Sequence, residues 1–283
     1  MAGFFGLFDY TKEGPGVPKN APKKKTFVVF FETFFRNFWK FITINIVYSL
    51  ISIPLVTNGL ANVGLANVVR NTARDKHSFG LSDFFDTIRK NFKQSLIAGI
   101  INTLLYAILF FDLWFFRNVA GTPGIIATGL TLALLFTFIM MNFYLWTLII
   151  TFSYSLKQAY SVSFKLTFLN FKYSFLIAFV NILLLAATIG LLFITGKSWI
   201  YVLIFELLLL VTVYPAFNGL LIQFCIFPSI KKFIIDPYYK EHPNEDIEKR
   251  QSLGLEIEEQ KKIIPDEVES GEDVDGDDSI FND

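Results

Sequence analysis

The chain has 283 residues, of which 53% are hydrophobic and 34 are Phe, and its mean hydropathy is +0.48. Between Asn37 and Phe227 several stretches of about twenty residues are almost free of charge, which is the length needed to cross ~30 Å of hydrocarbon. This composition excludes an ordinary water-soluble domain. The sequence therefore predicts an all-α protein, a polytopic transmembrane helical bundle with amphipathic interfacial helices.

The formal net charge of zero hides an uneven distribution of charge. Residues 1–244 hold 21 Lys/Arg against 10 Asp/Glu, a net charge of +11, whereas residues 245–283 hold 4 against 15, a net charge of −11. A basic excess in a membrane protein marks segments that stay in the cytoplasm beside anionic lipid. We therefore expect the lipid bilayer, and not nucleic acid, to be the partner of the basic part.

The residue types of common active sites are scarce. Cys225 is the single cysteine, and His77 and His242 are the two histidines. Neither a Walker A motif nor a dinucleotide glycine motif occurs, and the acidic string at 273–278 has its glycine at the wrong step for a calcium loop. These absences predict a non-enzymatic protein without cofactor or metal, and leave a membrane enzyme that relies on carboxylates as a third hypothesis.

The chain begins with a Gly/Pro/Lys-rich segment at 1–26, predicted to be a flexible basic arm, either anchored in the headgroup layer or a disordered leader. It lacks the features of a cleavable signal peptide, so we expect the first span to remain as an anchor. Phe27–Lys40 carries charges at four-residue steps and is predicted to be an amphipathic helix on the membrane surface. The first span is predicted at about Asn37–Ile53 and stops at Pro54.

Leu55–Arg70 is ambiguous, because it combines small residues with three asparagines. If it returns through the membrane, it must be buried among neighbouring helices, where small residues allow close contact. Four clearer spans follow it, at about Gln94–Phe116, Pro123–Phe152, Phe171–Ile194 and Trp199–Phe227.

Basic residues bear on the ambiguous segment, because residues 1–40 hold seven of them and residues 70–93 hold six. Two crossings that turn at Pro54–Gly59 place both clusters in the cytoplasm, as the positive-inside rule prefers. This favours six spans; five are possible if Leu55–Arg70 is re-entrant or interfacial. The sequence thus predicts a multi-pass protein of the cytoplasmic membrane with both termini in the cytoplasm. Its transmembrane domain is residues 27–235, and a partly disordered acidic tail occupies 236–283, with the last helix ending or breaking at Asp236-Pro237.

A short pattern recurs as Asn37-Phe38-Trp39-Lys40, Asn91-Phe92-Lys93 and Asn170-Phe171-Lys172. An aromatic, amphipathic stretch precedes each copy and an apolar helix follows it. The second and third copies also share a serine four residues after the asparagine, and asparagines Asn102 and Asn181 eleven residues after it. The pattern indicates helical hairpins derived from one unit, as in many transporters, unless the short matches arise by chance in a Phe-rich chain.

The candidate intramembrane polar site consists of Glu206, Asp112, Asn102, Asn181 and Asn218. Intramembrane carboxylates often mark a pathway or a ligand contact. The structural alternatives are that Asp112 pairs with Arg117, that Glu206 is protonated or satisfied by Lys197 or a tyrosine, and that the asparagines hydrogen-bond between helices. Four tryptophans, Trp39, Trp114, Trp146 and Trp199, fall near span ends and are expected at the membrane interface.

The run Ile53-Pro54-Leu55-Val56-Thr57-Asn58-Gly59 through Val69-Arg70, with Ser82-Asp83-Phe84-Phe85 and Lys90-Asn91-Phe92-Lys93-Gln94, resembles the YesL family of bacterial membrane proteins over roughly residues 27–230. Asn58 stands where that family usually has Ile. The opening Met1–Tyr10 looks like the leader of family members from Gram-positive gut anaerobes. The family has no known biochemical function, but its members tend to be encoded beside carbohydrate uptake systems and glycoside-degrading enzymes.

The resemblance implies an accessory or regulatory role in carbohydrate uptake, with a transporter component or its regulator as a partner of the acidic tail. The alternative is a transporter or channel for a small solute in its own right, which Glu206, the asparagines and the hairpin pattern favour.

Overall fold

The computed structural model describes residues 25–76, 78–194 and 199–241, and within these ranges the only regular secondary structure is helical. The chain divides into two units, Met1–Lys231 and Lys232–Asp283, and each is considered by itself. The predicted arm at 1–26 and the acidic tail at 236–283 lie almost wholly outside the described residues.

In chain order the elements are α1 (Thr26–Arg36), α2 (Phe38–Ser52), the 3-10 turn η2 (Leu55–Thr57), α3 (Asn58–Ala73), α4 (Leu81–Lys90), α5 (Phe92–Arg117), α6 (Thr122–Thr151), α7 (Leu156–Leu169), α8 (Phe171–Ile194), α9 (Trp199–Thr212), α10 (Tyr214–Ile230), the π-helical turn η4 (Lys231–Ile235) and α11 (Asp236–Glu241).

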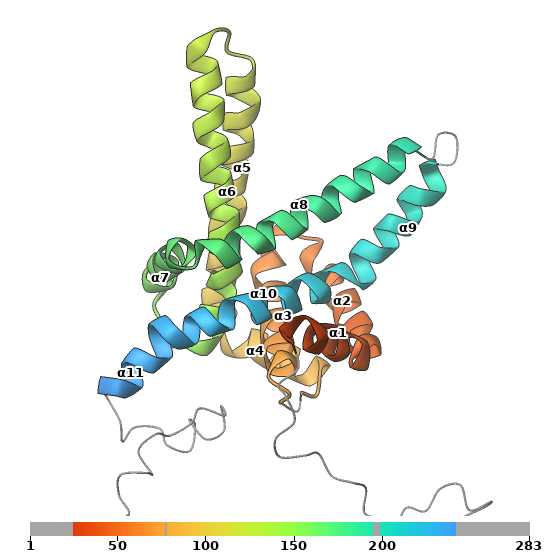
Figure 1. Ribbon diagram of the computed structural model, residues 1–283, viewed down its shortest axis with the longest axis vertical. Coiled ribbons are helices and arrows are strands. Elements are labelled where there is room, and N and C mark those ends of the chain that lie inside the picture. The colour runs from red at the N-terminus through yellow and green to blue at the C-terminus, as the bar shows by residue number, and fades with distance from the viewer. Residues whose placement is uncertain (1–24, 77, 195–198, 242–283) are drawn as a thin grey trace, which may run out of the picture. The chain divides into compact units, whose positions relative to one another are not determined.

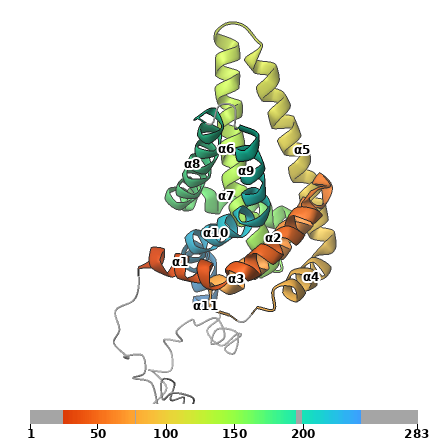
Figure 2. The ribbon, with the colours of Figure 1, turned by 90° about the vertical axis from the view of Figure 1, so that its right-hand side faces the viewer.

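The first unit uses one arrangement three times: a short helix, a single asparagine, an apolar entry helix and a return helix (Figure 1). The first hairpin is α1–α2–α3, the second is α4–α5–α6, and the third is α7–α8 with α9 and α10 as a divided return. Entry and return helices contact each other in the second and third hairpins, since α5 contacts α6, and α8 contacts α9 and α10. Figure 2 shows α5 and α6 meeting at their turn at the top of the view. The predicted recurrence of hairpins is therefore present in the structure.

The linking asparagines share one backbone geometry. Asn37, Asn91 and Asn170 have φ of −107°, −111° and −118°, with ψ between 16° and 36°. Each ends one helix and begins the next, and its backbone N–H still donates to the carbonyl four residues earlier. The side chains of Asn37 and Asn91 also donate to that carbonyl, at 2.9 and 3.0 Å. Because a short amide side chain can bond to its own backbone in this way, asparagine suits such a corner.

α3 is the most enclosed of the helices and contacts α2, α4, α5, α6 and α10. It crosses α5 backbone to backbone, because a Cβ on Gly59 would lie 2.1 Å from the carbonyl oxygen of Ser95 and 2.8 Å from the Cα of Gly99. On the α4 side, a Cβ on Gly64 would lie 2.8 Å from the ring of Phe84. α3, which contains most of the ambiguous segment, is buried among its neighbours, as a segment returning through the membrane would have to be, and its small residues are what allow the close contact.

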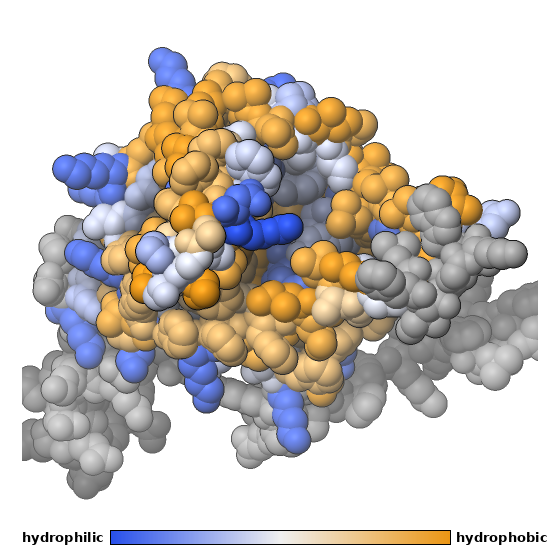
Figure 3. All heavy atoms as spheres, turned by 90° about the horizontal axis from the view of Figure 1, so that it is seen from above, coloured by the Kyte–Doolittle hydropathy of each residue, from blue (hydrophilic) through white to orange (hydrophobic). Residues whose placement is uncertain are grey.

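Four helical stretches within the described residues are long and apolar enough to cross a membrane: Phe92–Arg117, Thr122–Thr151, Phe171–Leu191 and Tyr214–Lys240. Large apolar side chains are exposed along them, such as Phe111 at 60% and Leu185 at 61%, and hydrophobic residues cover most of the face seen in Figure 3. Exposure on this scale suits lipid as the solvent. The chain is thus a membrane protein in character.

The expectation of six full-length spans is not met by the helix lengths. α2, α3 and α9 have 15, 16 and 14 residues, which at 1.5 Å per residue gives about 21–24 Å, less than the hydrocarbon thickness. The first hairpin does turn where predicted, at Pro54 and η2.

The span predicted at Trp199–Phe227 is wrong, because it is two helices, α9 and α10, with a break at Val213. Pro215 explains the break, since proline has no N–H to donate to the carbonyl of Val211 and its ring crowds that carbonyl. Two side chains of α2 occupy the carbonyls at the break: Ser49 donates to Val211 at 3.3 Å, and Asn45 donates to Thr212 at 2.7 Å.

Two further boundaries differ from prediction. Phe27–Lys40 is not one helix, because α1 ends at Arg36 and Lys40 belongs to α2. α1 packs on the bundle through Phe30 and Phe34, whose ring centroids lie 5.3 and 5.5 Å from that of Phe217 on α10. The expected end at Asp236 is instead the first residue of α11, where Pro237 needs no N–H partner.

Candidate functional site

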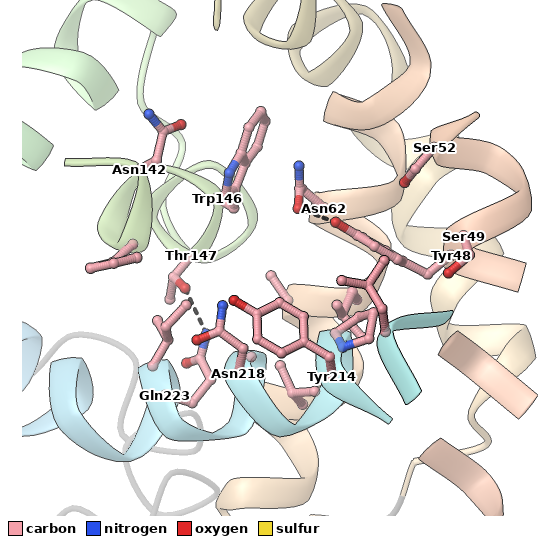
Figure 4. Close-up of a pocket in the computed structure, with 18 of the residues that line it drawn as sticks. Tyr48, Ser49, Ser52, Asn62, Asn142, Trp146, Thr147, Tyr214, Asn218 and Gln223 are labelled. Carbon is pink, nitrogen blue, oxygen red and sulfur yellow. Dashed lines mark hydrogen bonds between the residues drawn. The ribbon is translucent and has the colours of Figure 1, made fainter. Parts of the chain in front are cut away.

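A cavity of about 450 Å³ lies between α2, α3, α6, the end of α9, and α10 (Figure 4). It has apolar walls and a set of polar side chains, and among the described residues that line it none is charged. The polar and aromatic members shown in Figure 4 are Tyr48, Ser49, Ser52, Asn62, Asn142, Trp146, Thr147, Tyr214, Asn218 and Gln223.

Each hairpin contributes one asparagine from its return helix to the cavity. Asn62 comes from α3, Asn142 from α6 and Asn218 from α10, and we call these three the cavity asparagines. They face the same open space from different sides in Figure 4. The cavity therefore lies where the three hairpins meet.

Each cavity asparagine accepts a hydrogen bond at Oδ1 from the entry helix of its own hairpin. The donors are the Tyr48 hydroxyl to Asn62 at 3.1 Å, Asn102 Nδ2 to Asn142 at 2.6 Å, and Asn181 Nδ2 to Asn218 at 3.0 Å. All three donors stand eleven residues after the linking asparagine of their hairpin. The predicted match at this position thus has a shared structural task, which is to orient a cavity amide.

Two tyrosines fix the donors in turn. The Tyr160 hydroxyl of α7 donates to Asn102 Oδ1 at 2.9 Å, and the Tyr214 hydroxyl of α10 donates to Asn181 Oδ1. The resulting networks join α5, α6 and α7 in one case and α8 with α10 in the other. Satisfied polar networks of this kind hold a site rigid.

The cavity asparagines keep hydrogen-bonding capacity for a ligand. An amide NH₂ has two hydrogens, of which Asn62 uses one toward Asn58 Oδ1 at 3.1 Å and Asn142 uses one toward the Phe138 carbonyl at 2.9 Å. The NH₂ of Asn218 has no hydrogen-bond acceptor within the described part of the chain. The site can therefore donate from several directions at once.

Other side chains complete the wall. Gln223 Nε2 donates to Thr147 Oγ1 at 2.7 Å, and Gln223 is only 3% exposed. The Trp146 indole forms an aromatic surface beside the cavity asparagines (Figure 4). Amides and hydroxyls with an aromatic wall, and without charge, suit a neutral polar molecule. Such a lining offers no strong counter-charge to an ion.

The structure brings together three of the five residues predicted as a polar site. Asn218 lines the cavity, and Asn102 and Asn181 lie one hydrogen bond behind it. These amides also form hydrogen bonds between helices, which was the structural alternative given for the span asparagines.

Asp112 and Glu206 are not part of the cavity lining. Among the described residues no ion pair joins Asp112 to Arg117. Glu206 on α9 has one carboxylate oxygen, Oε1, that is buried without a hydrogen-bond partner in the described part of the chain. Its suggested partner Lys197 lies outside the described residues.

Sequence reasoning missed several residues of the cavity. Tyr48 and Asn62 belong to the first hairpin. There a tyrosine, and not an asparagine, stands eleven residues after the linking asparagine, so only the spacing, and not the residue type, could have indicated it. Trp146, which was predicted at a membrane interface, lines the cavity. Trp39 and Trp114 are exposed, at 79% and 65%. The side chain of Trp199 is outside the described residues.

In comparison with known proteins, residues 41–113 match a family model described as a protein of unknown function, DUF624. The matched stretch runs from α2 into α5 and includes Tyr48, Asn62 and Asn102. No curated protein and no solved structure matches the chain.

Proposed function

We propose that the chain is a non-enzymatic membrane protein that binds a neutral, hydroxyl-rich solute, such as a small sugar, and that it acts as an accessory or regulatory component of carbohydrate uptake. The observation that carries this proposal is the uncharged cavity with three oriented amides. Each sugar hydroxyl both donates and accepts a hydrogen bond, and so does each amide group. The apolar face of a sugar ring can rest on the Trp146 indole.

Two further observations support a carbohydrate role. A cavity of about 450 Å³ falls in the range of small-molecule sites, roughly 300–1,000 Å³. The residues that carry the resemblance to the YesL family, from Ile53 to Gln94, all fall inside the stretch matched by the DUF624 model, and that resemblance implies a genetic link to carbohydrate uptake.

Binding can be measured on purified full-length protein by isothermal titration with a panel of neutral mono- and disaccharides, and with charged sugar acids and amines of equal size. We expect a neutral sugar to bind and Asn218→Ala to weaken it by about tenfold, since one hydrogen bond to a buried polar group is worth about 1–3 kcal/mol. Asn118→Ala, at the exposed turn between α5 and α6, is the matched control and should bind normally. Tighter binding of a charged analogue would contradict the proposal.

The accessory role predicts a protein partner for the acidic segment 245–283, whose net charge is −11. Mild detergent extraction from the native membrane should co-purify a carbohydrate transporter component or its regulator. Removing residues 245–283 should release that partner while sugar binding is retained. An unchanged set of co-purified proteins would count against a role of the tail.

The second candidate is a transporter in its own right. It is favoured by the buried Glu206 oxygen, which has no hydrogen-bond partner among the described residues, and by the repeated hairpins. Reconstituted liposomes should then accumulate the sugar that binds, and Glu206→Gln should alter the dependence of that flux on proton or sodium gradients. Glu32→Gln, on the exposed face of α1, is the matched control. Binding without flux would favour the accessory role.

A further inference from the structure

A second cavity, of about 360 Å³, lies where the end of α1, the first turn of α2 and the loop after α3 meet. It is separate from the cavity that contains the cavity asparagines and shares none of its lining residues. Its walls are formed by Arg36, Asn37, Lys40, Thr72, Asp75, Lys76 and Ser78.

Positive charge exceeds negative charge around this cavity. Asp75 is the one carboxylate among its lining residues, and it forms an ion pair with Arg36. Lys40 is half-buried, and its Nζ donates to a neutral group, the Thr72 hydroxyl, at 3.3 Å. Among the described residues, no ion pair involves Lys76. Asp83, on α4, also acts on Lys40 through space. Of the three cations in the described lining, Lys76 is therefore the one with the least negative charge opposite it.

Two more arginines, Arg70 on α3 and Arg74 just after its last residue, add positive charge that acts on Lys76. Arg70 donates to Thr151 Oγ1 at 2.8 Å and to Asn67 Oδ1 at 2.7 Å, and the Arg74 guanidinium lies 4.1 Å from the ring centroid of Phe227. Neither has a carboxylate partner within the described residues. Arg70 Nε and Arg74 Nη2 are buried without an acceptor there.

Burial and the positive electrostatic potential at the end of α3 lower the pKa of the cations there. Burial, and then repulsion from Arg70, lowers the pKa of Arg74 to about 10. Burial, followed by repulsion from Arg74 and Arg70, also lowers the pKa of Lys76 below its ordinary value. Lysines that only follow the positive-inside rule are exposed and solvated, so burial and crowding distinguish this cluster. An anion in the cavity would offset the repulsion that Lys76 experiences from the two arginines.

We propose that the second cavity binds a phosphate group between Lys40 and Lys76. Phosphate has several acceptor oxygens, and the two ammonium groups supply charged donors to it. The Ser78 hydroxyl accepts from the Gly80 N–H at 3.4 Å and keeps its own hydrogen for a further bond. The phosphate belongs either to a lipid headgroup, beside which the basic clusters are predicted to lie, or to a small phosphorylated compound.

The test uses full-length protein stripped of phospholipid, with inorganic phosphate, glycerol 3-phosphate and, in a separate arm, nanodiscs of phosphatidylglycerol or phosphatidylcholine. We expect phosphate or glycerol 3-phosphate to raise the melting temperature relative to chloride at equal ionic strength, or phosphatidylglycerol to be retained selectively. The first result identifies a soluble ligand and the second a lipid.

The double variant Lys40→Gln/Lys76→Gln should lower the affinity for the bound species at least tenfold. Lys157→Gln/Lys165→Gln, two exposed lysines of α7, removes the same charge elsewhere and should leave it unchanged. Lys76→Gln alone lies in a loop, so it tests the site even if the Lys40 change impairs folding. Absence of binding by every probe, or equal losses in both double variants, would overturn the proposal. Sugar binding should be unaffected in either case.

Discussion

Single asparagines set the corners of this molecule. At Asn37, Asn91 and Asn170 one residue with nearly constant φ ends a surface helix and begins an apolar one. Eleven residues later the chain again places a polar side chain, Tyr48, Asn102 or Asn181, which orients a cavity asparagine. Positions spaced by four and eleven lie on one face of a helix. A corner residue therefore fixes which side chain of the entry helix bonds to a cavity asparagine.

The crossing of α3 and α5 depends on two glycines, and Gly59→Ala tests it. A Cβ there would lie 2.1 Å from the Ser95 carbonyl oxygen, which is backbone and cannot turn away. We expect a loss of stability of about 1–3 kcal/mol or more, as in overpacked cores, measured by thermal or denaturant unfolding in detergent.

Gly129→Ala is the control for that substitution, because a Cβ on Gly129 would meet nothing within 4 Å. Alanine is the better helix former by about 1 kcal/mol, so this variant should be neutral or more stable. Equal behaviour of the two alanine variants would show that the close contact does not govern stability.

At the scale of elements, hydropathy predicted the long helices and failed where apolar composition hides a break. Leu203–Leu210 and Leu220–Phe227 are equally apolar on both sides of Pro215, so a window of average hydrophobicity does not see the proline. The carbonyls at the break receive hydrogen bonds from Asn45 and Ser49, more than 160 residues earlier in the chain. A partner so far away in the chain leaves no signal in the local sequence. The cavity beside the break was missed for the same reason.

Ser49 and Pro215 should therefore be energetically coupled. With proline at 215, Ser49→Ala leaves the Val211 carbonyl without its side-chain donor, and we expect a cost of about 0.6–1.7 kcal/mol, the range of hydrogen bonds between membrane helices. With Pro215→Ala, the new N–H can reach that carbonyl, so Ser49→Ala should cost little. Unfolding of the four proteins of this double-mutant cycle gives the coupling. Additive effects would contradict this account of the break.

The polar site shows the same limit of sequence reasoning. Asn102 and Asn181 were found because they repeat at one spacing, and Asn218 because it is polar within an apolar run. Their partners were not assigned, because pairing between the entry and return helices depends on how those helices pack. Tyr48 escaped notice because a different residue type performs the same task as the two asparagines. Repeat position therefore carries more information here than residue identity.

For the molecule as a whole, the remaining prediction is its orientation in the membrane. Basic residues are concentrated at residues 1–40 and 70–93, whereas Arg117, the last residue of α5, is the only basic residue next to the turn between α5 and α6. Under the positive-inside rule α4 lies in the cytoplasm and the α5–α6 turn outside. The second cavity, which belongs to the basic end of α3, would then face the cytoplasm, where phosphorylated compounds and anionic headgroups are available.

Thiol labelling of single cysteines tests this orientation in a Cys225→Ser background. Asn118→Cys places a thiol in the α5–α6 turn, and Asp86→Cys places one on the exposed face of α4. We expect a membrane-impermeant maleimide to label position 118 in intact cells and position 86 only after permeabilisation, because α5 separates the two by one crossing. Labelling of position 86 from outside would reverse the orientation. Labelling of both in intact cells would mean that α5 does not cross, which its 26 apolar-rich residues make the least expected result.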